Sequence, residues 1–309
     1  MTFTLEEVFS SVYRAADTLP IELPSRSIRF GEHRSQFRGD GHDFDRVVEY
    51  DPQVHSIAQI DWRSMTRDKV FVRESKVTKD FSVIMMADLS TSMAFGVRDC
   101  QHKERMLLET LGDIGLACFH AQDPMGLIGF AEDVVINELP KVGEDHVFYL
   151  TEQLYELFNG FYSDGKGKLD RRRTDFYNAF DFLMRTYVNT NCLIIVVSDF
   201  IGLQNLPNPK VLEDILSHHE MVFIFLDDPV EFESKSIAGH LKMRNMETGK
   251  QTVVARRKIK ELGINIRKIR KAEREKLRGI GIDSIVLEYG KHFQRLQRFF
   301  LIRQELFRS

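Results

Sequence analysis

The sequence predicts an α/β protein built on a doubly wound, mostly parallel sheet, with a small N-terminal β-containing region before it. From residue 81 onward, apolar segments of strand length alternate with longer segments of helical periodicity. The apolar segments are nearly continuous, which is typical of parallel strands covered by helices on both faces. We therefore divide the chain into residues 1–80, a helix and a small β-rich region, and residues 81–309, the α/β domain.

The first region begins with a helix. Apolar residues at helical spacing predict an amphipathic helix over residues 4–16, and prolines follow it. From residue 25 to residue 80, glycines separate short segments rich in β-branched and aromatic residues, such as 47–50 and 70–73. These segments predict short strands, either in a small module of their own or as an addition to the larger sheet.

In the second region, strands and helices follow in turn. The predicted strands are 81–87, 126–130, 134–139 at an edge, 192–197, 221–226 and 283–287. The predicted helices are 103–121, 144–158, 175–188, 209–217, a long basic segment near 252–279, and a closing helix from about 290.

Composition excludes several classes of protein. The 309 residues carry 43 Lys and Arg against 46 Asp and Glu, a net charge of -3, so the whole chain is not a polyanion binder. Three cysteines without CxxC spacing support neither a disulfide framework nor a thiolate metal site. No apolar run approaches the roughly 18 residues that span a bilayer, and the N-terminus lacks the pattern of a signal peptide. We expect a cytoplasmic protein with no membrane span.

Oxygen-bearing side chains follow two of the predicted strands. Asp88, Ser90 and Ser92 come directly after the first strand, Asp199 follows strand 192–197, and Thr174 precedes a helix. In an open parallel sheet, ligands bind where the strands end. Hard oxygen donors suit Mg²⁺ or Mn²⁺. The alternative is that Asp88 is a solvated turn residue, but the second carboxylate and the threonine favour a metal site made of all five residues.

This set of residues resembles the metal-ion-dependent adhesion site (MIDAS) of von Willebrand factor A domains. Asp88-x-Ser90-x-Ser92, a distant Thr174 and Asp199 after an apolar strand match its motif. The resemblance implies that the two Ser hydroxyls bind the ion directly. It also implies that the Thr and the Asp residues bind it directly or through water.

Further motifs resemble one bacterial family of A-domain proteins, the domain-of-unknown-function family fifty-eight, over roughly residues 25–305. The shared motifs are Gly31-x-His33-x-Ser35-x-x-Arg38-Gly39-Asp40-Gly41-x-x-Phe44, Ile60-Asp61-Trp62, the Asp88 loop, Met125 to Phe130, Asp228-Pro229 and Glu247-x-Gly249. Members are often encoded beside MoxR-type AAA+ ATPases, so the resemblance implies such an ATPase, or its client, as the partner.

Two departures from that family's pattern stand in this chain. Val54-His55-Ser56 replaces a Gly-Asp-Asp run, which leaves the role of that turn open. Arg173 replaces the Gly usual before the metal-site Thr, which places Arg171, Arg172 and Arg173 beside the expected ion as a possible anion-attracting rim.

Such a site would bind a protein partner rather than catalyse a reaction. An octahedral ion held by these residues keeps a position for water or for the carboxylate of a partner's Asp or Glu. One alternative is a metal-dependent hydrolase, but Ser90 stands where dehalogenase-like phosphatases have their second Asp, and Gly165-Lys166-Gly167-Lys168 is not a phosphate-binding loop. The other alternative is a structural scaffold that needs no metal.

A basic segment leaves a second question open. Residues 250–280 contain six Lys and six Arg against three Glu. Such a run is most simply a solvated helical face, and the alternative is a docking surface for an acidic partner. No nucleic-acid-binding module accompanies it, so we do not expect a nucleic-acid partner.

Overall fold

The structure is a computed structural model that describes residues 3–16, 43–50, 70–76, 81–93, 102–163, 173–187, 190–200, 206–228, 240–244 and 251–308. The chain divides into two compact units, residues 27–81 and residues 1–26 together with 82–309. In the smaller unit, β1 (Asp43–Glu49) pairs antiparallel with β2 (Phe71–Lys76), which confirms the two short strands expected there.

The larger unit is built on a six-stranded sheet of strand order β10-β7-β6-β3-β4-β5. Its strands are β3 (Phe81–Asp88), β4 (Met125–Phe130), β5 (Val134–Lys141), β6 (Asn191–Ser198), β7 (Glu220–Asp227) and β10 (Asp283–Glu288). β3 pairs parallel with β4, and β6 and β10 both pair parallel with β7. The edge strand β5 is antiparallel to β4, and two register shifts interrupt this pairing. The predicted fold class is confirmed, and the arrangement is compatible with a Rossmann-like von Willebrand factor A fold.

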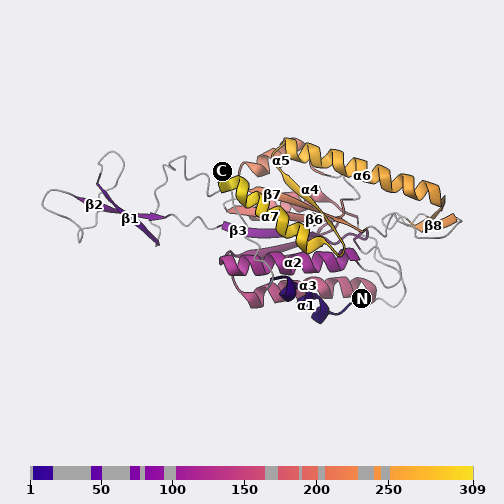
Figure 1. Cartoon of the computed structure of the whole chain (residues 1–309), viewed down its shortest axis with the longest axis horizontal. Helices are drawn as coiled ribbons and strands as arrows, with labels where there is room; N and C mark the ends of the chain where they lie inside the picture. The colour runs from indigo at the N-terminus through magenta and orange to yellow at the C-terminus, as the bar shows by residue number, and fades with distance from the viewer. Residues whose placement is uncertain are drawn as a thin grey trace. The chain divides into compact units, whose positions relative to one another are not determined.

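Helices cover both faces of this sheet (Figure 1). They are α2 (His102–Ala121), α3 (Glu144–Ser163), α4 (Phe176–Thr186), α5 (Pro209–Leu216), α6 (Arg256–Gly279) and α7 (His292–Arg308). α2 and α3 lie below the strands in this view, and α4, α5 and α6 lie above them. None of the helices in the described ranges is both long and apolar enough to cross a membrane.

Side chains from successive strand positions are buried on opposite faces, which explains why the strands are apolar throughout. Ile84 and Met86 of β3 belong to the cluster packed against α4 and α5, while Val83 and Met85, one residue away along the strand, are buried as well. Phe180 and Phe223 join the same cluster, with ring centroids 6.4 Å apart. The strands that carry the site described below are therefore closely packed against the helices.

The N-terminal helix α1 (Leu5–Ala16) confirms the predicted amphipathic helix and packs on α2 and α3. Phe9 meets Phe148 of α3 edge to face, with centroids 4.8 Å apart, and Tyr13 donates a hydrogen bond to Glu144 at 3.0 Å. Val12 lies so close to Gly112 of α2 that a Cβ there would stand 2.7 Å from the Val12 side chain. Helix α1 therefore lies in the same unit as the sheet.

One helix begins later than the sequence predicts. The long basic segment was expected to be helical from about residue 252, but α6 starts at Arg256. Residues Gln251–Ala255 form β9, which pairs antiparallel with β8 (His240–Arg244). The prediction for 252–255 is wrong because Thr252, Val253 and Val254 are β-branched, which favours a strand when a partner is available.

Candidate metal centre

The order of the strands creates one break in the winding of the sheet. After β3 the chain continues through α2 to β4 on one side of β3, and later it returns to place β6 on the other side. The helices that follow the two strands diverge at such a point and leave a crevice at the carboxyl ends of the strands, where doubly wound proteins bind ligands. Asp88 ends β3 and Ser198 ends β6, so both stand at this break.

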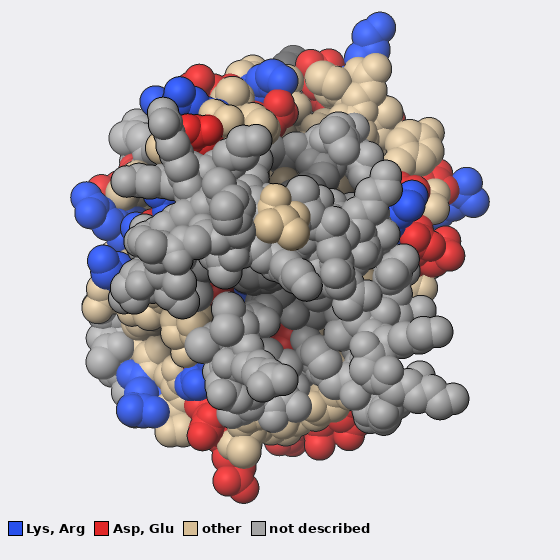
Figure 2. Space-filling view, turned by 90° about the vertical axis from the view of Figure 1, so that its right-hand side faces the viewer, with Lys and Arg blue, Asp and Glu red and all other residues tan. Residues whose placement is uncertain are grey.

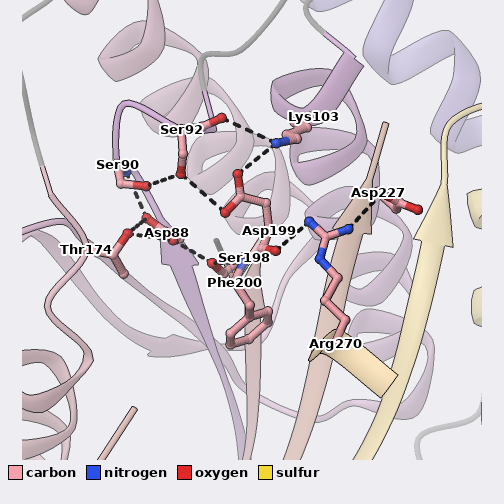
Figure 3. Close-up of polar contacts among 10 residues, drawn as sticks. All are labelled: Asp88, Ser90, Ser92, Lys103, Thr174, Ser198, Asp199, Phe200, Asp227 and Arg270. Carbon is pink, nitrogen blue, oxygen red and sulfur yellow. Dashed lines mark hydrogen bonds and ion pairs between the residues drawn. The ribbon is translucent and has the colours of Figure 1, made fainter. Parts of the chain in front are cut away.

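The turn after β3 is fixed by hydrogen bonds of its own. The backbone N–H of Ser90 donates to Asp88 Oδ1 at 2.8 Å, and the N–H of Met93 donates to the carbonyl of Ser90 at 3.0 Å. The N–H of Leu89 donates to the carbonyl of Phe130, which ties the turn to β4. These bonds bring Ser90 and Ser92 together, with their hydroxyl oxygens 3.0 Å apart (Figure 3).

Asp88 is fully buried and receives hydrogen bonds from three elements. The hydroxyl of Ser198, at the end of β6, donates to Asp88 Oδ2 at 2.5 Å. The hydroxyl of Thr174, just before α4, donates to Oδ2 at 3.2 Å and lies 3.4 Å from Oδ1. The carboxylate therefore joins the ends of both central strands to the segment before α4.

Asp199 completes the group from the other side. Its Oδ1 accepts a hydrogen bond from the hydroxyl of Ser92 at 3.2 Å. The structure thus brings together all five residues of the predicted site, Asp88, Ser90, Ser92, Thr174 and Asp199, and at most 6 % of any of them is exposed. That they bind a metal ion stays a prediction.

The oxygen atoms are spaced as hydrogen-bonded pairs are, and this spacing is also compatible with neighbouring ligands of a small octahedral cation. When each ligand lies about 2.1 Å from the ion, neighbouring ligands of an octahedron are about 3 Å apart. The contacts between Ser90 and Ser92, between Ser92 and Asp199 and between Thr174 and Asp88 range from 3.0 to 3.4 Å. Among the described residues, no group of three or more His, Cys, Asp or Glu side chains could hold a metal ion. Any metal ion bound here would therefore depend on hydroxyl oxygens as ligands, together with the carboxylates of Asp88 and Asp199.

Lys103 is a member of this group that the sequence analysis missed. This side chain, in the first turn of α2, is fully buried, and its Nζ donates to Asp199 Oδ2 at 2.7 Å. The same Nζ lies 3.5 Å from the carbonyl oxygen of Ser92. Since its ammonium already balances Asp199, the two carboxylates are not both left to balance a divalent ion. A bound ion would have to share Asp199 with Lys103.

The burial of Asp88 changes its acidity. Removal from water, followed by the nearby negative charge of Asp199, raises the pKa of Asp88 to about 6. The hydrogen bonds from Ser198 and Ser90 act in the opposite direction but do not cancel this effect. In the absence of another cation, Asp88 therefore holds a proton more readily than an exposed aspartate.

Phe200 holds Asp199 in place through an unusual backbone conformation. Its φ of +51° lies in the left-handed region, which costs a residue with a side chain about 1–3 kcal/mol. Its N–H donates to the hydroxyl of Ser198 at 2.9 Å. The centroid of its ring lies 5.3 Å from the ring centroid of Phe176 and 4.3 Å from that of Phe225. The buried ring and the hydrogen bond together offset the strain.

Arg270 supports the same segment from α6. Its guanidinium donates to the main-chain oxygen of Asp199 at 2.9 Å and to Asp227 Oδ1 at 2.7 Å, and only 4 % of the residue is exposed. Neither Lys103 nor Arg270 carries a sequence signal that would have placed it here. Each lies on a helix whose position is known only from the fold.

An open hollow lies beside the predicted metal ligand Thr174. It has a volume of about 570 Å³, and its lining includes Glu132, Asp133, Arg173 and Asp175 as well as Thr174. Arg173 is exposed, as expected of a rim residue, while Arg171 and Arg172 lie outside the described residues. The family motifs at residues 31–41, 54–62 and 247–249 also lie outside them.

Comparison with known proteins identifies one family and several solved structures. Residues 47–276 match the family described as "Protein of unknown function DUF58". No curated protein matches the chain. The conserved hypothetical protein BatB from Bacteroides thetaiotaomicron is 14% identical, with 74% of this chain and 100% of that chain covered and a TM-score of 0.40.

Two further solved structures are similar to the chain. An aerotolerance-related membrane protein from Bacteroides fragilis is 16% identical, with 74% of this chain and 100% of that chain covered and a TM-score of 0.41. The PilB minor pilin from Streptococcus sanguinis is 9% identical, with 79% of this chain and 66% of that chain covered and a TM-score of 0.38.

Proposed function

Since the chain belongs to the DUF58 family, whose function is unknown, we propose from the site itself that this protein binds an acidic side chain of a protein partner through a divalent metal ion. The observation that carries the proposal is the convergence of Asp88, Ser90, Ser92, Thr174 and Asp199 at the break in the sheet, with oxygen spacings near 3 Å. These five residues would hold Mg²⁺ or Mn²⁺. When bound, the ion would supply a positive centre that accepts an oxygen ligand from the partner.

The residues of the chain would prepare this interaction in distinct ways. The hydrogen bonds to Asp88 fix its orientation before any ion arrives, and the strained backbone at Phe200 does the same for Asp199. The hollow beside Thr174 offers an approach from solvent. Because three acidic residues, Glu132, Asp133 and Asp175, line that hollow against one basic residue, Arg173, a bound cation would favour the approach of an acidic partner.

We extend the proposal to the partner and to the setting. The family resemblance noted above supports a MoxR-type AAA+ ATPase, or a protein on which it acts, as the partner in the cytoplasm. The protein would then serve as an adaptor in the assembly or maturation of other proteins. No catalytic step is part of this proposal, and turnover of a generic phosphoester that disappears in D88A would replace it with hydrolysis.

One observation favours a second candidate function. The ion pair between Lys103 and Asp199 already supplies a cation inside the site. If that ammonium suffices, the Asp88 turn is a metal-independent scaffold that shapes a binding surface. In that case partner binding would be the same in chelator and in Mg²⁺.

The test is calorimetric titration of the chelator-stripped protein with Mg²⁺ and with Mn²⁺. We expect saturable binding of one ion in the wild type, and loss of at least tenfold in affinity in D88A and S90A. D133N is the matched control, because Asp133 is an exposed carboxylate near Thr174 that is not among the five residues. Absence of binding in the wild type, or an equal loss in D133N, would reject the metal-dependent mechanism.

A further inference from the structure

A second feature of the larger unit is a basic pocket formed by α6, β10 and the start of α7. Five of its described lining side chains are basic, namely Arg267, Arg270, Lys271, Arg274 and Arg295. Only Asp227 and Glu288 are acidic. Figure 2 shows described Lys and Arg side chains around the left, top and right of one face of the molecule, with Asp and Glu side chains among them.

The spacing of the sequence explains how one helix supplies four of these side chains. Residues 267, 270, 271 and 274 follow the i, i+3, i+4, i+7 pattern that lines one face of an α-helix. That face meets Asp227 and Glu288, the last residues of β7 and β10. The pocket therefore extends along the edge strand β10 to the carboxyl ends of β10 and β7.

The charges in the pocket do not cancel. Arg270 pairs with Asp227 at 2.7 Å, and Arg295 pairs with Glu288 at 2.8 Å. Arg274 is different, because its guanidinium donates to the hydroxyl and the carbonyl of Ser284, which are both neutral. Burial lowers the pKa of Arg274, as expected for a cation that is removed from water without a carboxylate beside it. An anion that entered the pocket would supply the missing negative charge.

The buried base of the pocket is Arg270, whose guanidinium is held in place. Only 4 % of Arg270 is exposed, and its guanidinium is held by Asp227 and by the main chain of Asp199. Its Nε is buried and has no hydrogen-bond partner among the described residues. Arg267 and Lys271 are exposed and stand closer to solvent. A fixed, buried arginine with exposed basic side chains beside it suits the capture of an anion.

The size of the pocket limits what it would take. Its volume of about 510 Å³ is that of a small-molecule site, and Val286 is its one apolar residue among those described. A compact, highly charged ligand fits such a lining better than an apolar one. Guanidinium groups bind phosphate oxygens in a bidentate manner.

We propose that this basic pocket binds a small molecule that carries at least two adjacent phosphate groups. The ligand is distinct from the metal ion and the partner carboxylate described above, and the proposal does not depend on them. The excess of basic side chains over acidic ones in the lining and the uncompensated Arg274 together support it.

Calorimetric titration of the full chain with inorganic pyrophosphate, without divalent ions and at physiological ionic strength, tests this proposal. We expect saturable binding of one pyrophosphate, and affinity at least tenfold weaker in R274Q and severalfold weaker in R267Q. R278Q is the matched control, since Arg278 is an exposed arginine of the same helix outside the pocket lining. It should change affinity less than twofold, and circular dichroism should show that all variants are folded.

Three results would overturn the proposal. One is no saturation at millimolar pyrophosphate. Another is an equal loss in R274Q and R278Q, which would indicate attraction by the whole helix rather than a site. The third is tighter binding of a hexaglutamate peptide than of pyrophosphate, with the same dependence on Arg274, which would instead assign the pocket to an acidic protein segment.

Discussion

At the scale of single residues, Lys103 decides how the candidate metal centre behaves. A fully buried lysine is stable only beside a carboxylate, and here that carboxylate is also a predicted metal ligand. The ammonium and a divalent ion would therefore compete for Asp199. This competition would make metal affinity lower than the five oxygen ligands alone suggest.

Replacing Lys103 by methionine distinguishes the effect of the lysine ammonium on Asp199 from the effect of a divalent ion. K103M leaves Asp199 buried without its partner, which in other proteins costs about 3–5 kcal/mol. We therefore expect K103M to unfold at a lower temperature than the wild type in chelator. Millimolar Mg²⁺ should restore much of the loss, and the affinity for Mg²⁺ should exceed that of the wild type.

Thermal unfolding in chelator and in Mg²⁺, together with titration calorimetry, measures both effects. R105Q serves as a control because Arg105 lies in the same turn of α2 but pairs with Glu109, away from Asp199. A K103M protein that unfolds at the same temperature with and without Mg²⁺ would show that the ion does not use Asp199.

If the candidate site binds a metal ion, the raised pKa of Asp88 should make the affinity depend on pH. With a pKa of about 6, only about a quarter of Asp88 is ionised at pH 5.5 and nearly all of it at pH 7.5. Since the ion requires the ionised form, its affinity should be about fourfold lower at pH 5.5. Titration calorimetry at the two pH values measures this, and equal affinities would contradict the role of Asp88.

The same shift in pKa affects the metal-free protein. The folded state binds a proton at Asp88 more tightly than the unfolded chain does, so the unfolded state has fewer protons bound between pH 4 and pH 6. The contribution of Asp88 to stability should therefore fall as the pH rises through that range, and D88N should lack this dependence.

The residues of the candidate site were predictable to different degrees. Asp88, Ser90, Ser92 and Asp199 could be found because they directly follow apolar strands, and the carboxyl ends of parallel strands meet at one edge. Lys103, Arg270 and the backbone strain at Phe200 could not. A lysine in the first turn of a helix looks like any solvated residue until the helix is placed against the sheet.

At the scale of elements, the strands were the easiest to predict and the pairing of helices the hardest. Strands such as β6 and β7 are continuous apolar runs because both of their faces are covered. Strand β9 was missed because a short β-branched segment directly before a basic helix has no alternation of its own. Likewise, the amphipathic pattern of α1 predicts a helix without saying which surface it covers.

The docking of α1 on α2 depends on a residue with no side chain. A Cβ at Gly112 would lie 2.7 Å from Val12, so G112A should destabilise the protein by about 1–3 kcal/mol, although alanine favours a helix by about 1 kcal/mol. Trimming the opposing side chain in the double variant G112A/V12A should remove the clash. We expect it to be more stable than the sum of the two single changes predicts.

Chemical denaturation of the wild type, the two single variants and the double variant measures this coupling. G160A is the control, since a Cβ at Gly160 meets nothing within 4 Å and should not destabilise the protein. Additive effects of G112A and V12A would mean that α1 does not lie against α2 at this position.

At the scale of the larger unit, the candidate metal centre and the basic pocket share a residue. Arg270 lines the pocket and also holds the main chain of Asp199. The protein has a net charge of only -3, yet these two places contain both buried carboxylates and a surplus of arginines. The charges are therefore concentrated locally, and the net charge of the whole chain does not reveal them.

The antiparallel strand β5 has a consequence for the solubility of the folded protein. It ends the sheet, and an outermost strand offers unpaired backbone groups to any other extended chain. Pro140 has no amide hydrogen to offer, and the register shifts in the pairing with β4 make the strand irregular. Neighbouring copies of the protein therefore find a poor template for strand pairing along β5.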